Sequence, residues 1–176
     1  MTAIEETTVW LEKAVIGLNL CPFAKAVHGK GQIRWVLSDA TEPAALLELL
    51  VQELQHLAAA DPEVVDTTLI VHPQVLQDFL DFNDFLGVAD EALEEMGLTG
   101  VLQVASFHPQ FQFADTDADD ITNATNRSPY PTLHLLREDS VERAVAAFPE
   151  AETIFERNIE TLRRLGPEGW RMLFKR

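Results

Sequence analysis

The sequence lacks the features of membrane and secreted proteins. It has a single cysteine, Cys21, which permits no internal disulfide and is typical of a reducing compartment. No stretch approaches the roughly 18 consecutive apolar residues that suggest a membrane span. Residues 1–6 are acidic where a secretory signal is basic and then apolar. We therefore expect a cytoplasmic protein.

Basic residues are missing from the middle of the chain. No lysine or arginine occurs between Arg34 and Arg127, whereas 18 of the 29 acidic residues lie in that interval and account for the net charge of −16. Such a surface repels nucleic acid and anionic lipid, so we expect neither as a partner. The simplest interpretation is a solvated acidic surface that aids solubility. The more specific interpretation is that this surface docks a basic partner protein.

Several motifs with known chemistry are also missing. The sequence contains no phosphate-binding glycine loop, nucleophile elbow or basic aromatic patch. The aspartates from position 115 begin like a calcium loop, but Asp120 replaces the sixth-position glycine and Asn126 the twelfth-position glutamate. Cys21 with two of the histidines matches no compact zinc pattern, so zinc is only weakly indicated and a metal is left undetermined.

The composition and the periodicity favour one α/β domain. The 176 residues are 47% hydrophobic, which suits a single domain over residues 1–176. Strands are predicted at 32–37, 64–71, 101–107 and 132–136. Helices are predicted at 5–18, from Pro22, from Thr41 to Asp61, from His72-Pro73 to Gly97, from Asp139 or Ser140, and at 150–165. This order predicts a four-stranded, mostly parallel or mixed sheet flanked by helices, with a ferredoxin-like α+β sandwich as the alternative. The oligomeric state is left open.

Reactive and hydrogen-bonding side chains gather in two stretches, 106–113 and 126–134. In open α/β sheets, ligands bind beyond the carboxyl ends of the strands. His72 and His108 each follow a predicted strand and precede a proline, so parallel neighbouring strands place both imidazoles on one rim. The alternative is that the His-Pro pairs only mark the strand ends.

The second stretch carries the candidate ligand-binding residues. Arg127, between Asn126 and the Ser128 to Tyr130 turn, is predicted to present its guanidinium to a carboxylate or phosphate. Pairing of Arg127 with a local aspartate is the alternative. His134 alternates with leucines, so a satisfied core histidine is the commoner outcome there, although it also counts as a candidate ligand residue.

Cys21 is a candidate nucleophile. Pro22 fits the first turn of a helix, and free amides at a helix start favour a thiolate, as do Lys25 and His28 one and two turns later. Pairing with His28 or His108 would activate the thiol. A small buried apolar cysteine is the alternative.

Several segments together resemble a known family. Residues 21–25 (CPFAK), 106–109 (SFHP), 125–131 (TNRSPYP), 133–138 (LHLLRE) and 158–162 (NIETL) are similar to a family of small bacterial proteins filed as domain of unknown function 1415. The resemblance spans nearly the whole chain. It implies a single-domain bacterial cytoplasmic protein, and it implies no activity, fold or ligand.

Two hypotheses for function follow, and whether the protein is an enzyme is left open. In the first, Arg127 and Asn126 hold a small anionic ligand, His108 acts as general acid or base, and Cys21 is a nucleophile. In the second, the chain is a non-catalytic interaction module whose acidic middle region docks a basic partner.

Overall fold

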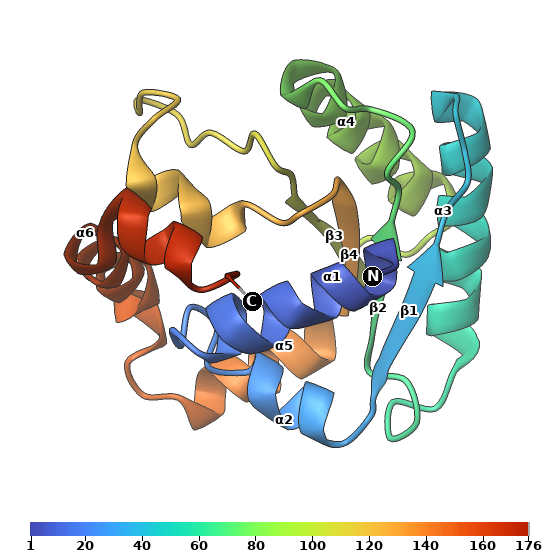
Figure 1. The fold of residues 1–176 in the computed structure, drawn as a ribbon. Coiled ribbons are helices and arrows are strands. Elements are labelled where there is room, and N and C mark those ends of the chain that lie inside the picture. The colour runs from blue at the N-terminus through green and yellow to red at the C-terminus, as the bar shows by residue number, and fades with distance from the viewer. Residues whose placement is uncertain (176) are drawn as a thin grey trace.

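A four-stranded mixed sheet stands at the centre of the computed structural model, which describes residues 1–175 (Figure 1). Its strands are β1 (Ile33–Leu37), β2 (Thr67–Val71), β3 (Leu102–Phe107) and β4 (Thr132–Arg137). The spatial order is β1-β2-β4-β3; β1 and β2 are parallel, and β4 is antiparallel to both of its neighbours. This confirms the predicted α/β class with a mixed sheet. The chain order β-α-β-α-β-β differs from the ferredoxin-like β-α-β-β-α-β, so that alternative was wrong.

The placement of β4 defines one rim of the sheet. The chain crosses from β2 to β3 through α4, and β3 does not lie next to β2 in the sheet. Strand β4 then inserts between β2 and β3. Because β1, β2 and β3 point the same way, their carboxyl ends meet at the same edge. We call this edge, formed by the residues that follow these three strands, the rim.

Helices cover both faces of the sheet. They are α1 (Ala3–Trp10), α2 (Ala24–Gly29), α3 (Pro43–Ala59), α4 (Phe79–Glu95), α5 (Glu138–Ala147) and α6 (Ile154–Met172). Three shorter turns complete the set: η1 (Leu11–Ile16, a π-helix that continues α1), η2 (Ile121–Asn126) and η3 (Ala151–Thr153). Within residues 1–175, none of these helices is long and apolar enough to cross a membrane.

Each face has its own core. The leucines of α3 and the apolar side of α4 pack against Ile70, Leu133 and Leu135, which are fully buried. On the opposite face, Trp10 and its neighbours on η1 pack against β1 and the end of β3. Figure 1 shows the arrangement, with α3 and α4 on one side of the sheet and α1 on the other.

Element ends differ from the sequence predictions where a polar side chain decides the boundary. Helix α4 begins at Phe79 instead of His72-Pro73, because the Asp78 carboxylate caps its first turn. Strand β2 begins at Thr67 instead of 64, because a turn on Asp61 takes the amides of the preceding residues. The helix predicted to end at Gly166 is interrupted there, because Gly166 has a φ of 72° and a ψ of 171°, and a second helical segment then continues to Met172.

Helix α5 also begins earlier than expected. It follows β4 directly at Glu138, with no side-chain cap from Asp139 or Ser140. The Ser140 hydroxyl instead donates to Asp66 at 2.6 Å, a tertiary contact that the local sequence does not reveal.

Candidate functional site

His72 and His108 lie together on the rim, as their positions after β2 and β3 predicted. Both residues are buried, and both rings contact Phe82 of α4, with centroid distances of 5.6 and 5.0 Å. Their strands are not hydrogen-bonded neighbours, because β4 lies between them. The common strand direction alone therefore brings the two imidazoles to one place.

Both imidazoles hold the loop that leads into α4. His72 Nδ1 donates to the carbonyl oxygen of Val75 at 3.1 Å, and His108 Nε2 donates to that of Leu76 at 3.0 Å. Leu76 has a φ of 59°, in the left-handed region that a leucine rarely adopts. The two histidines thus fix a strained turn between β2 and α4.

The hydrogen bonds also show which nitrogen of each neutral imidazole carries the hydrogen. A carbonyl only accepts, so His72 Nδ1 carries the hydrogen and His72 Nε2 carries a lone pair, which has no partner within residues 1–175. His108 Nδ1 accepts from the amide of Gln110 at 3.0 Å, which leaves its hydrogen on Nε2. Burial lowers the pKa of His72 to about 4, and burial also lowers that of His108. Both rings are therefore neutral at pH 7, and His108 has no free nitrogen for acid–base chemistry.

Arg127 binds its own chain. Its Nε donates to the carbonyl of Phe111 at 2.9 Å, and one Nη donates to that of Ala118 at 2.6 Å. Burial lowers the pKa of the guanidinium, and the charge of Asp120 opposes this shift. The predicted fork is therefore directed at two backbone oxygens of the acidic segment between β3 and η2.

Asn126 has a comparable internal role. Its side-chain nitrogen donates to the carbonyl of Ser106 at 3.2 Å, and its own carbonyl accepts from the amide of His108 at 3.1 Å. These two bonds attach η2 to the outer edge of β3. Asn126 therefore satisfies strand groups that would otherwise lack partners.

Ser128 and Tyr130 fix the turn that enters β4. The Ser128 hydroxyl donates to the carbonyl of Tyr130 at 2.6 Å. The Tyr130 hydroxyl donates to Glu6 of α1, and this bond raises the pKa of Tyr130. Both side chains are therefore engaged with the protein itself.

His134 and Cys21 lie across the sheet from the histidine pair. His134 packs on Phe107 at 5.8 Å, and burial lowers its pKa to about 4. Cys21 packs with the apolar cluster of η1. Helix α2 begins at Ala24 and not at Pro22, so Cys21 is not its N-cap. The amides of Phe23 and Ala24 lower the pKa of Cys21, but burial outweighs them and raises it. The expected thiolate is therefore not favoured.

The remaining predicted pairings are also not formed. His28 Nε2 lies 3.0 Å from Glu12, an acid that the sequence gave no reason to single out. Among the described residues, no three His, Cys, Asp or Glu side chains are grouped so as to hold a metal ion. Cys21 and the histidines thus do not form the zinc set considered from the sequence.

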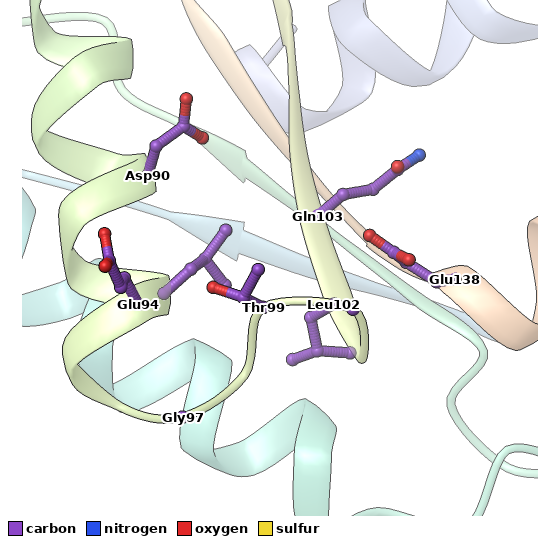
Figure 2. A pocket seen from close by; sticks show the side chains of 9 residues that line it. Asp90, Glu94, Gly97, Thr99, Leu102, Gln103 and Glu138 are labelled. Atoms are coloured by element: carbon purple, nitrogen blue, oxygen red, sulfur yellow. The ribbon is translucent and has the colours of Figure 1, made fainter.

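A second candidate site, which the sequence did not locate, lies at the opposite end of the sheet. A hollow of about 690 Å³ lies between α4, the loop after it and the start of α5. Asp90 and Glu94 border it on one side and Glu138 on the other, with Thr99 and Leu102 between them (Figure 2). We call this the acidic hollow. The spacing of Asp90 and Glu94, one helical turn apart, was its only local signal.

A family model described as a protein of unknown function, DUF1415, matches residues 2–172. The chain belongs to this family. The match confirms the resemblance seen in the sequence, and it covers both the rim and the acidic hollow. Comparison with curated proteins and with solved structures gives no match.

In this member of the DUF1415 family, the two candidate sites differ in how their polar groups are used. The rim residues that resemble the family motifs form hydrogen bonds with backbone groups of the protein itself, notably His108, Asn126 and Arg127. The carboxylates of the acidic hollow form no ion pair within residues 1–175. Internal bonds thus occupy the polar groups of the rim, whereas the carboxylates of the hollow have no internal ion-pair partner among the described residues.

Proposed function

We propose that this DUF1415 chain is a non-catalytic interaction module whose acidic hollow docks a basic segment of a partner protein. The observation that carries the proposal is the placement of Asp90, Glu94 and Glu138 around one open hollow. These residues come from two helices distant in sequence, so their convergence is a property of the fold.

The three carboxylates of the hollow have no ion-pair partner within residues 1–175. Helix α4 carries six acidic residues and no lysine or arginine. The ion pairs found within residues 1–175 involve Glu12, Glu53, Glu150 and Glu168, all outside the hollow. A concave surface lined by charge of one sign focuses the field and attracts the opposite charge. A lysine- or arginine-containing segment therefore suits this place.

The uncharged lining also suits such a segment. Thr99 and Gln103 offer hydrogen-bonding groups beside the carboxylates. Gly97 and Gly100, both with positive φ, turn the chain here without adding side chains to the hollow.

The hypothesis of a small anionic ligand has less support. Its main donors, Arg127 and Asn126, already bind backbone carbonyls, and His108 uses both ring nitrogens. Cys21 has a raised pKa and lies on the other face of the sheet from His108. An anion at the rim would first have to displace these internal bonds.

A matched pair of triple variants tests the docking proposal. The first, D90N/E94Q/E138Q, removes the three carboxylates of the hollow. The second, E152Q/E156Q/E160Q, removes three carboxylates from the exposed C-terminal region and changes the net charge equally. Binding of a short fluorescein-labelled peptide of alternating lysine and alanine is measured by fluorescence anisotropy at low and high salt.

We expect the hollow variant to bind the peptide roughly tenfold more weakly than the control variant, because three exposed charge contacts together contribute about 1.5 kcal/mol. The affinity of the wild-type chain should also fall as salt rises. Equal losses in the two triple variants, or affinity that ignores salt, would show that the hollow has no special role.

A further inference from the structure

Strand β1 forms an uncovered edge of the sheet. It pairs only with β2, and in a parallel ladder alternate residues direct their backbone groups toward the neighbour. The bonds at its two ends, from Thr67 to Gln32 and from Ser38 to Val71, show that the even-numbered residues face β2. The amides and carbonyls of Ile33, Trp35 and Leu37 therefore point outward. Within residues 1–175 they have no hydrogen-bond partner.

The view in Figure 1 supports the same description. It looks onto the sheet from the side of β1, and no other segment of ribbon passes in front of this strand. Strand β1 is also less covered than its neighbour β2. All five residues of β2 are buried, whereas none of the five in β1 is, and Leu37 is 55% exposed.

The opposite edge of the sheet is covered where β3 ends. At the outer side of β3, Asn126 binds both the carbonyl of Ser106 and the amide of His108. Proteins usually protect exposed edges with proline, bulges, lysine or a covering segment. The sequence of β1, Ile-Arg-Trp-Val-Leu, has none of these, and its one charged side chain is already paired, since Arg34 donates to Glu53 at 2.8 Å.

We propose that β1 pairs antiparallel with β1 of a second copy of this chain, about a two-fold axis at Trp35. In this register Ile33 of each copy lies opposite Leu37 of the other, and the two Trp35 residues face each other. The outward groups then form about six backbone hydrogen bonds. The two sheets become one continuous eight-stranded sheet, and the interface is isologous.

The strand is chemically suited to pair with itself in this register. Ile33, Trp35 and Leu37 are all apolar and share one face of the sheet, so every pair on that face is apolar. On the other face, Arg34 lies opposite Val36 of the second copy, which keeps the two arginines from facing each other. A second copy is therefore the occupant that the sequence of β1 fits, in preference to an unrelated peptide.

Sedimentation equilibrium of the full chain tests this proposal over a range of protein and salt concentrations. We expect a dimer that strengthens with salt, because salt screens the repulsion between two chains of net charge −16. Leu37→Pro removes an outward amide that has no internal partner, and Leu37→Lys adds a charge to the apolar face. Both should weaken the dimer at least tenfold. Val145→Lys, at an exposed apolar position on α5, is the control and should leave the dimer unchanged.

Hydrogen exchange locates the interface and does not depend on any variant. The amides of Ile33, Trp35 and Leu37 should exchange more slowly as protein concentration rises. A wild-type chain that stays monomeric at the highest attainable concentration overturns the proposal. A dimer in which these three amides exchange at an unchanged rate, or which Leu37→Lys leaves intact, also overturns it.

Discussion

His72 makes the stability of this protein depend on acid in a way that can be measured. The ring is fully buried against Phe82, donates from Nδ1 to Val75, and has an unpartnered lone pair on Nε2. A proton on Nε2 would create a charge beside apolar groups. His108 further disfavours a charge on His72, and Asp78 in turn favours a charge on His108.

The sign and the size of the effect follow from the pKa of His72, which burial lowers from 6.5 to about 4. Because the unfolded chain binds the proton more readily, the stabilising effect is complete above pH 6.5 and is lost as pH falls toward 4. A shift of this size corresponds to about 3 kcal/mol, a large part of the stability of an ordinary domain. His108 and His134, whose pKa values are also lowered by burial, act in the same direction.

The variant His72→Asn tests this reasoning by urea unfolding at several pH values. Asparagine can still donate to Val75 but does not titrate. At pH 7 the variant should be less stable by about 2–4 kcal/mol, because the lost ring leaves a cavity. Between pH 6.5 and 4 the difference from wild type should shrink by about 3 kcal/mol. His56→Asn, at an exposed position on α3, controls for the loss of a histidine. Parallel stability curves for wild type and His72→Asn would refute the argument.

Three further predictions concern residues that the protein uses internally. Cys21 should react with iodoacetamide more slowly than a free thiol at pH 7, because burial raises its pKa. Faster labelling in the native state would contradict this prediction and support a role of Cys21 as a nucleophile. Arg127→Ala should lose about 2–3 kcal/mol of stability in urea and expose segment 111–118 to proteolysis, since two charge-assisted bonds to that segment disappear; Arg127→Lys should restore only part, and a resistant segment in Arg127→Ala would contradict the role. Arg34→Met should lower the free energy of unfolding by about 3 kcal/mol, because it leaves the buried carboxylate of Glu53 unpaired. Glu53→Gln should lower it by only about 1 kcal/mol, because the Arg34 side chain is 39% exposed and can be hydrated. Equal losses in urea unfolding would show that burial of the carboxylate does not matter.

The strands could be predicted because each has a recognisable apolar pattern in the sequence. The helix boundaries could be predicted less well. The sequences of β2 and β3 are apolar runs bounded by turn residues, and both His-Pro pairs do follow strand ends. The apolar spacing of α4 appeared to begin at Val75, which is buried but lies in the loop ahead of the helix. Periodicity reports burial, and only the Asp78 cap marks where the helix starts. In α5, the tertiary bond from Ser140 to Asp66 removed the expected cap.

The rim was located from sequence, but the use of its side chains was not. Strand direction placed His72 and His108 together, since any two strands that run the same way end on the same side. The sequence shows that Arg127 and Asn126 need hydrogen-bond partners. It does not show whether a partner is a ligand or a backbone carbonyl 16 or 20 residues away along the chain. That distinction depends on the path of the loops, which no local pattern encodes.

The acidic hollow shows the reverse situation, in which the charge was visible and the site was not. Counting residues gave an acidic middle region, and Asp90 and Glu94 belong to it, but Glu138 lies outside the interval between Arg34 and Arg127. The β3–β4 register, which pairs Leu102 with Arg137, brings Glu138 to the same end of the sheet as the last turns of α4. An antiparallel pairing of strands separated by 24 residues, among them η2, is decided by packing. Residues of the family motifs such as His108, Asn126 and Arg127 therefore hold segments of the fold together, whereas the surface that we propose for docking is formed by residues that only folding brings together.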